Sequence, residues 1–126
     1  MASQIAAGAA NNGAMTILKR VENCTLDDLA RADGLAVGSP TYYCNMAWQI
    51  KKFLDEKMLE FYAKGNSLRN KVCGCFTSAG VSADGQECLR AFDLAFRMAL
   101  KMRVLPGLVL ESMRVDGDDV ACFKFG

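Results

Sequence analysis

The sequence predicts an α/β protein of three layers, in which helices cover both faces of a mainly parallel sheet. Segments with a helical spacing of apolar residues alternate with short apolar runs. Those runs show no alternation of polar and apolar residues, which is typical of strands buried on both faces. Alternation of helices and strands along a chain favours a parallel sheet. The length of 126 residues suits one domain, so we expect 1–126 to form a single domain.

The chain is expected to begin with a helix and a strand. Residues 3–12 are rich in alanine and predict a short helix, weakened by Gly8. The pair Asn12-Gly13 is a helix stop and turn signal. The run AMTILKRV at 14–21 predicts a strand.

A second short helix and a buried strand are expected next. Thr25 and Asp28 have the spacing of a capping box, in which two side chains satisfy backbone N–H groups at a helix start. They predict a helix over 26–32. The run at 34–38 is apolar without alternation and predicts a strand buried on both faces.

Two longer helices are expected in the remainder of the chain. The segment 46–63, with Asn45 as its N-cap, places its apolar residues on one stripe and most charged residues off it. The segment 86–103 has apolar residues on more than one side, which predicts a helix covered from several directions.

The other expected strands are 71–77, 108–113 and 120–125. The pair Asp116-Gly117 predicts a hairpin turn between the last two of them. The C-terminal part of the chain is therefore expected to end in a strand.

Composition excludes several classes of function. The chain has no histidine, which excludes Ser-His-Asp and Cys-His catalysis and histidine-ligated metals. The net charge is +1 without a basic run, which argues against nucleic acid as a partner. No apolar stretch approaches the ~20 residues of a membrane span.

The cysteines and the N-terminus indicate a cytoplasmic protein. The six cysteines are scattered and form no C-x-x-C pair, which argues against zinc or iron–sulfur sites. The first residues lack the pattern of a signal peptide. We therefore expect reduced thiols, most of them buried as small apolar residues.

Two loops rich in serine, threonine and glycine are candidate binding elements. The loops 39–45 and 78–85 each follow a predicted strand and precede a predicted helix. The carboxyl ends of parallel strands meet at one edge of a sheet, where ligands bind in such folds. Tyr42, Tyr43 and Trp48 could seat a flat heteroaromatic ring beside the backbone N–H groups of a helix start. The alternative is that these three are ordinary packing residues.

Both loops carry family signatures. The run GSPTYYCNM at 38–46, with WQ at 48–49 and KFLD at 52–55, resembles the G-S-P-T-Y-F-G-N-M…Q-x-K-x-F-L-D segment of flavodoxin-like proteins. The resemblance is to the NAD(P)H:quinone oxidoreductase and multimeric flavodoxin branch, the tryptophan-repressor-binding-protein type. Residues 71–80 and 85–87 resemble its second signature, K-x-x-x-x-F-T-S-x-G…G-G-Q-E, and the resemblance covers about residues 3–110.

This resemblance implies a flavodoxin-like fold and an FMN-binding oxidoreductase or electron-transfer protein, with NAD(P)H or a redox protein as its partner. The flavin then supplies the redox chemistry and the protein holds it. Cys44 stands where the family usually has glycine, and it is strained if that position needs a positive φ. The residues that the resemblance places around the flavin ring are Pro40, Thr41, Tyr42, Tyr43, Cys44 and Asn45 in a first wall, and Thr77, Ser78, Ala79, Gly80 and Val81 in a second wall.

The family's first strand and its phosphate loop, [ST]-x-T-G-N-T, are not found in these 126 residues. FMN binding is therefore expected to be weakened or absent, because each charge-assisted hydrogen bond lost is worth roughly 1.5–3 kcal/mol. The strand at 34–38 would also lack a neighbour. Either 14–21 pairs with it or another chain fills the gap, which predicts a homo-oligomer, with exchanged elements as one arrangement. A third alternative is that the chain is a piece of a longer protein.

Two other functions stay open at this point. A flavodoxin-fold remnant could keep the fold without tight FMN binding and act as a structural or interaction protein. A thiol-redox protein could use Cys73 and Cys75, whose side chains point to the same face of a strand. For these two cysteines the sequence favours core packing.

Overall fold

The computed structural model describes residues 1–111 and 118–126, in which five strands form one sheet. The strands are β1 (Gly34–Tyr42), β2 (Asn45–Met46), β3 (Val72–Ala79), β4 (Arg103–Val104) and β5 (Leu108–Glu111). β3 pairs in parallel with β1, β4 and β5. β2 folds back antiparallel on the end of β1. The mainly parallel sheet is therefore confirmed.

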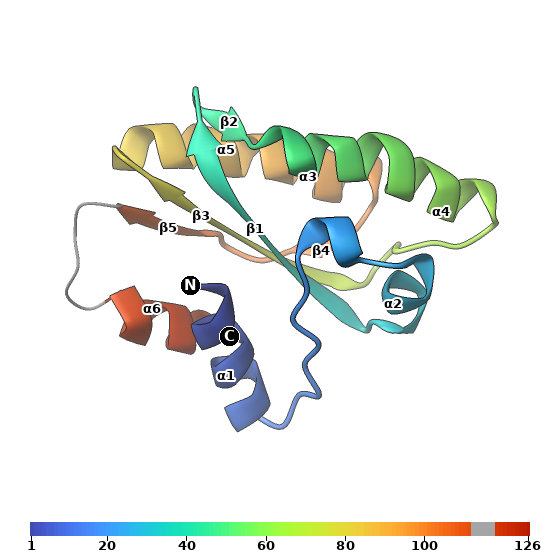
Figure 1. The fold of residues 1–126 in the computed structure, drawn as a ribbon, viewed down its shortest axis with the longest axis horizontal. Coiled ribbons are helices and arrows are strands. Elements are labelled where there is room, and N and C mark those ends of the chain that lie inside the picture. Colours follow the sequence, from blue (N-terminus) through green and yellow to red (C-terminus); the bar gives the residue numbers. More distant parts are fainter. Residues whose placement is uncertain (112–117) are drawn as a thin grey trace.

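Helices cover both faces of this sheet (Figure 1). One face carries α3 (Trp48–Lys52), η2 (Phe53–Met58) and α4 (Leu59–Ala63), which form one continuous helix, and α5 (Ser82–Asp93) with η3 (Leu94–Ala99), which form another. The other face carries α1 (Ala2–Asn11) and α6 (Asp118–Phe125). The short helices η1 (Val21–Asn23) and α2 (Leu26–Arg31) precede β1. None of the helices in the described residues is long and apolar enough to cross a membrane.

The two faces of β3 pack against two separate hydrophobic clusters. Cys73 and Cys75 lie in the larger cluster with Phe92 and Phe96 of the α5–η3 helix. Phe76 points to the smaller cluster, which holds residues of α1 and α6. Cys73 and Cys75 are buried, with their Sγ atoms 3.7 Å apart. The core position favoured for these two cysteines is therefore confirmed.

Most predicted elements are confirmed, with shifted ends. The predicted helices 3–12 and 26–32 correspond to α1 and α2. The predicted strands 34–38 and 71–77 are longer than expected, because β1 and β3 continue to Tyr42 and Ala79. The helix expected over 86–103 starts at Ser82 and ends at Ala99. The strand expected over 108–113 is described as far as Glu111.

The start expected for the helix over 46–63 is wrong. Asn45 and Met46 form β2, and the helix begins at Trp48 with Ala47 as its N-cap. The backbone N–H of Ala47 donates to Ser39 Oγ at 2.8 Å. A hydroxyl on the neighbouring strand therefore satisfies the donor at the helix start, and Asn45 is not the cap.

The strand expected over 14–21 is also wrong. Residues 14–20 form neither helix nor strand, and 21–23 form η1. A strand needs a hydrogen-bonded neighbour, and in the described residues the pairing partners of β1 are β2 and β3. The side chains of Met15, Ile17 and Leu18 are exposed. The segment 14–21 therefore does not fill the gap beside β1.

The strand expected over 120–125 is a helix, α6. Its apolar run packs against α1, and a Cβ atom at Gly8 would lie 1.9 Å from the carbonyl oxygen of Phe123. Glycine at position 8 thus allows the two helix backbones to touch. A short apolar run without alternation suits either element. The turn predicted at 116–117 lies outside the described residues.

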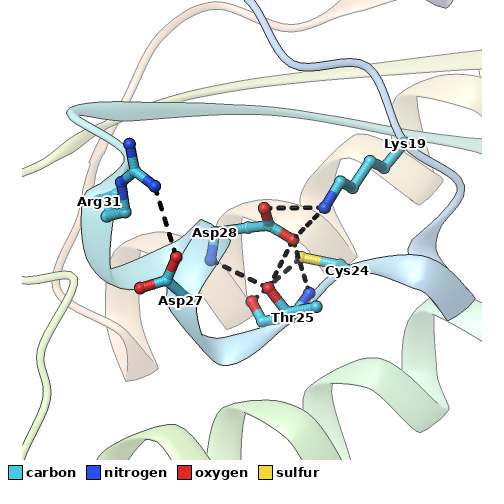
Figure 2. A network of polar contacts seen from close by, with 6 residues as sticks. All are labelled: Lys19, Cys24, Thr25, Asp27, Asp28 and Arg31. Atoms are coloured by element: carbon cyan, nitrogen blue, oxygen red, sulfur yellow. Dashed lines mark hydrogen bonds and ion pairs between the residues drawn. The ribbon is translucent and has the colours of Figure 1, made fainter.

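A polar network joins the irregular segment before η1 to the start of α2 (Figure 2). Asp28 N–H donates to Thr25 Oγ1 at 3.1 Å, and Thr25 N–H donates to Asp28 Oδ2 at 2.8 Å. This is the predicted capping box. Lys19 Nζ donates to both carboxylate oxygens of Asp28, at 2.8 and 2.7 Å. The network therefore fixes residue 19 relative to α2.

The same network predicts a pH dependence of stability. Hydrogen bonds from Lys19 and Thr25 hold the pKa of the Asp28 carboxyl well below its usual range. A lowered pKa in the folded state stabilises the fold above the ordinary carboxyl pKa of ~4, and this contribution is lost as the pH falls below that value. Asp28→Asn is expected to lower the free energy of unfolding at pH 7, and the difference from the parent is expected to shrink toward pH 2.

Urea denaturation at pH 7, 4 and 2.5 measures this difference. Asp27→Asn is the matched control, because Asp27 is exposed and its ion pair with Arg31 is long, at 3.6 Å. A loss in Asp28→Asn that stays the same at all three pH values would contradict the assigned role of the carboxylate.

Candidate functional site

The two loops with family signatures lie side by side at the carboxyl ends of β1 and β3. In the parallel register, Ser39 is opposite Thr77 and Pro40 is opposite Ser78. Thr41 Oγ1 lies 2.7 Å from Thr77 Oγ1. The first residues of both expected walls are therefore neighbours, at the edge of the sheet where ligands of such folds bind.

Buried hydroxyl groups hold the two walls together. Thr77 is fully buried, and its Oγ1 donates to the carbonyl oxygen of Ser39 at 2.7 Å. Since Thr77 has a single hydroxyl proton, the contact with Thr41 is made by the Thr41 hydroxyl as donor. Ser39 Oγ accepts from Ala47 N–H and donates to the Pro40 carbonyl at 2.7 Å. Each hydroxyl is satisfied, which favours a single arrangement of the site.

The first wall ends in a tight hairpin turn. Tyr43 and Cys44 connect β1 to β2, and their φ values are +49° and +60°. Positive φ at both central residues is typical of a type I′ turn, which favours glycine, asparagine and aspartate. The positive φ on which the expected strain of Cys44 depends is therefore present.

Cys44→Gly is expected to raise the free energy of unfolding by about 0.5–1 kcal/mol, because glycine adopts positive φ without the steric cost of a Cβ atom. Thermal or urea denaturation measures the gain. Cys44→Ala removes the thiol and keeps the Cβ, so it is expected to give no gain. Equal stability of the glycine and alanine variants would contradict the strain at this position.

Three aromatic side chains of this region are exposed. Tyr43 is fully exposed, and Tyr42 and Trp48 are 60% and 66% exposed. None of the three makes a ring contact with another aromatic residue in the described part of the chain. The alternative that they are ordinary packing residues is therefore wrong. Exposed rings beside the carboxyl end of a strand can stack on a flat ligand.

The second wall leaves open space. Ala79 is buried at the end of β3, whereas Val81 is exposed. Apart from the two residues next to Gly80 in the chain, no described residue has a heavy atom within 4 Å of the place where a Cβ atom of Gly80 would be. α5 begins at Ser82, directly after this wall, and its N-cap residue Val81 makes no side-chain capping hydrogen bond. The N–H groups of its first turn are thus not used by a side-chain cap, and they favour negative charge.

Cys44 also contacts α5 across the gap between the walls. Its Sγ donates to Asp84 Oδ1 at 3.6 Å. Partial desolvation and the carboxylates of Asp84 and Glu87 raise the pKa of the Cys44 thiol. At neutral pH this thiol is protonated and is therefore a weak nucleophile.

A cleft of about 320 Å³ adjoins the outer side of the first wall. Gly38, Pro40 and Tyr42 line it from β1, and Gln49 lines it from α3. On the opposite side it is lined by Lys19, Arg20 and Glu22. No local pattern in the sequence indicates this cleft, because its lining residues come from segments that are far apart in the chain.

Comparison with known proteins shows the family of this chain. Residues 19–114 match the model of a family described as NADPH-dependent FMN reductase. The chain belongs to this family. The matched residues include both walls and the segment that lines the cleft.

Relatives of this FMN reductase family member include two curated bacterial proteins. A flavodoxin of Aquifex aeolicus is 35% identical over 88 residues, which is 69% of this chain and 46% of that protein. An NAD(P)H dehydrogenase (quinone) of Geobacter metallireducens is 35% identical over 95 residues, which is 74% of this chain and 46% of that protein. The chain thus spans about half the length of these two relatives.

The fold of this family member is that of a flavodoxin. A solved flavodoxin from the domain Archaea superposes with a TM-score of 0.79 at 25% identity, covering 98% of this chain and 80% of that one. The flavodoxin-like fold predicted from the two signatures is confirmed.

Proposed function

We propose that this chain binds FMN between the two walls and acts as a flavin-dependent oxidoreductase or electron carrier that receives electrons from NAD(P)H. The observation that supports this most is the meeting of the two signature loops at the carboxyl ends of β1 and β3, tied by the Thr41–Thr77 contact of 2.7 Å. The proposed contacts to the flavin come from Pro40, Thr41, Tyr42, Tyr43, Cys44 and Asn45 and from Thr77, Ser78, Ala79, Gly80 and Val81.

The residues present suit the ring of a flavin. A flat heteroaromatic ring needs a slot with an aromatic face and close backbone approach. The exposed rings of Tyr42 and Tyr43 supply the face, and the open space at Gly80 leaves the backbone of the second wall accessible. The first turn of α5 adds N–H groups that favour an electron-rich edge of the ring.

In this proposal the chain's own residues bind and orient the flavin. They do not exchange protons with a substrate. The sequence has no histidine, and the raised pKa of Cys44 keeps its thiol protonated. When bound, FMN supplies hydride and single-electron transfer, as flavins do in such proteins. Thr77 and Ser39 hold the backbone of both walls in place, which keeps the slot at a fixed width.

Fluorescence titration tests this proposal. FMN and riboflavin are titrated with the chain, and saturable quenching of flavin fluorescence is expected for both, because the ring is the shared part. Consumption of NADPH is then measured with the chain plus FMN and with FMN alone. Absence of binding by both flavins would overturn the proposal and favour the alternative of a fold remnant with a structural or interaction role.

We also propose that the chain forms a homo-oligomer through the open edge at the start of β1, over 34–37, which do not line the cleft. In the described residues, 34–40 pair with β3 on one edge only, and apolar side chains at Met15, Ile17 and Leu18 are exposed nearby in the chain. An unpaired strand edge favours association with another chain. Sedimentation analysis over a range of concentrations measures the mass, and a monomer at all concentrations would contradict this proposal.

A further inference from the structure

The cleft beside the first wall has the position of a second subsite for the same ligand. Pro40 and Tyr42 belong to the first wall and also line the cleft, so the proposed ring site and the cleft share these two residues. The volume of about 320 Å³ is large enough for a small polar group such as a phosphate. From β1 the cleft is lined by Gly38, Pro40 and Tyr42, near the carboxyl end of the strand.

Arg20 supplies positive charge to this cleft. It is exposed and makes no ion pair with any residue that the structure describes. Its neighbour Lys19 is engaged by the carboxylate of Asp28, with an Nζ–Oδ2 distance of 2.7 Å. This ion pair ties residue 19 to α2, whereas the guanidinium of Arg20 has no such partner among the described residues. Glu22 also lines the cleft, and its carboxylate repels an anion bound there.

Gln49 of α3 supplies a neutral hydrogen-bond donor from the opposite side of the cleft. Its side chain is half-buried in the cleft, and its amide makes no hydrogen bond with another residue in the described ranges. A primary amide carries two N–H donors. Arg20 and Gln49 thus present donors without partners from two separate segments to one cleft.

We propose that this cleft binds the phosphate of FMN, with the Arg20 guanidinium as its main partner and the Gln49 amide as a second donor. This inference rests on the proposed function, because it assigns the phosphate end of the ligand whose ring lies between the walls. A guanidinium binds a phosphate through two parallel hydrogen bonds, which makes arginine well suited to this role. The ring and the phosphate then make independent contributions to affinity.

The test compares FMN with riboflavin, which differs by the phosphate alone. The parent chain is expected to bind FMN at least about tenfold more tightly than riboflavin, as a charge-assisted contact implies. Arg20→Gln is expected to lower the affinity for FMN by about tenfold and to leave the affinity for riboflavin unchanged. Glu22→Gln is expected to increase the preference for FMN, because it removes the opposing carboxylate.

Arg69→Gln is the matched control. Arg69 is also exposed and without an ion pair among the described residues, and it lies before the start of β3, at the end of that strand opposite the walls. Arg69→Gln changes the net charge by the same amount as Arg20→Gln. It is expected to keep the preference for FMN over riboflavin. Circular dichroism and thermal unfolding of each variant check that the fold is retained.

A second readout does not depend on affinity. The side-chain amide resonances of Gln49 are expected to shift on addition of FMN and not on addition of riboflavin. Equal binding of the two flavins by the parent chain, or an unchanged preference in Arg20→Gln, would overturn the phosphate site while leaving the ring site standing. Failure of both flavins to bind would overturn the proposed function and this inference together.

Discussion

Substitution of Phe92 by alanine is expected to lower the free energy of unfolding by about 3–5 kcal/mol. Phe92 lies in α5, is fully buried, and its ring centroid is 5.9 Å from that of Phe96. It belongs to the cluster that also holds Cys73 and Cys75 of β3. Removal of the ring leaves a cavity between α5 and the sheet, which the surrounding side chains fill only in part.

Urea denaturation at a single pH measures this loss. Leu94→Ala is the matched control two residues further along the same continuous helix, where the side chain is 65% exposed. It is expected to change the free energy of unfolding by about 0.5 kcal/mol or less. Similar losses in the two variants would contradict the packing of α5 against β3 through Phe92.

Substitution of Tyr43 by alanine is expected to weaken FMN binding by about 5- to 150-fold. Stacking of an aromatic side chain on a flat base is worth about 1–3 kcal/mol, which corresponds to that range. The Tyr43 ring is fully exposed at the tip of the turn between β1 and β2 and makes no ring contact with another described residue. Its loss therefore removes a ligand contact without opening a cavity in the core.

Tyr43→Phe separates this effect from that of the hydroxyl group. It keeps the ring and is expected to bind FMN within about twofold of the parent, because stacking depends on the ring face. Titration of flavin fluorescence measures both variants, and riboflavin is expected to follow the same order as FMN. An alanine variant with the affinity of the parent would show that Tyr43 does not contact the ring.

The parts of the fold that depend on local chemistry could be predicted from the sequence. The spacing of Thr25 and Asp28 predicted α2, and the structure has both hydrogen bonds of the capping box. The apolar runs at 34–38 and 71–77 predicted two parallel strands of the sheet; β1 contains the first run, and β3 contains the second from Val72 onward. In these segments, local preference and tertiary packing favour the same conformation.

The predictions that failed depend on neighbours far apart in the sequence. The run at 14–21 has the composition of a strand, but in the described residues no strand pairs with it. The run at 120–125 is short and apolar, and its helical state follows from packing against α1 at Gly8. Such contacts cannot be inferred from a run of six to eight residues.

The candidate site also has features that could be predicted from local sequence and features that depend on distant segments. The walls could be located from their signatures, and the adjacency of their strands is present in the structure. The positive φ of Cys44 was expected only conditionally and that of Tyr43 was not expected, because both depend on the hairpin with β2. The cleft with Arg20 and Gln49 had no sequence signal, since its two sides come from segments that the fold brings together.

Addition of FMN to isotope-labelled chain, followed by backbone amide chemical shifts, tests most directly whether the two loops form one flavin site. The largest shifts are expected at the non-proline amides of both 41–45 and 77–81, together and with the same concentration dependence. Shifts confined to one loop, or located at the opposite end of the sheet near Gly34 and Val72, would contradict a slot shared by the two walls.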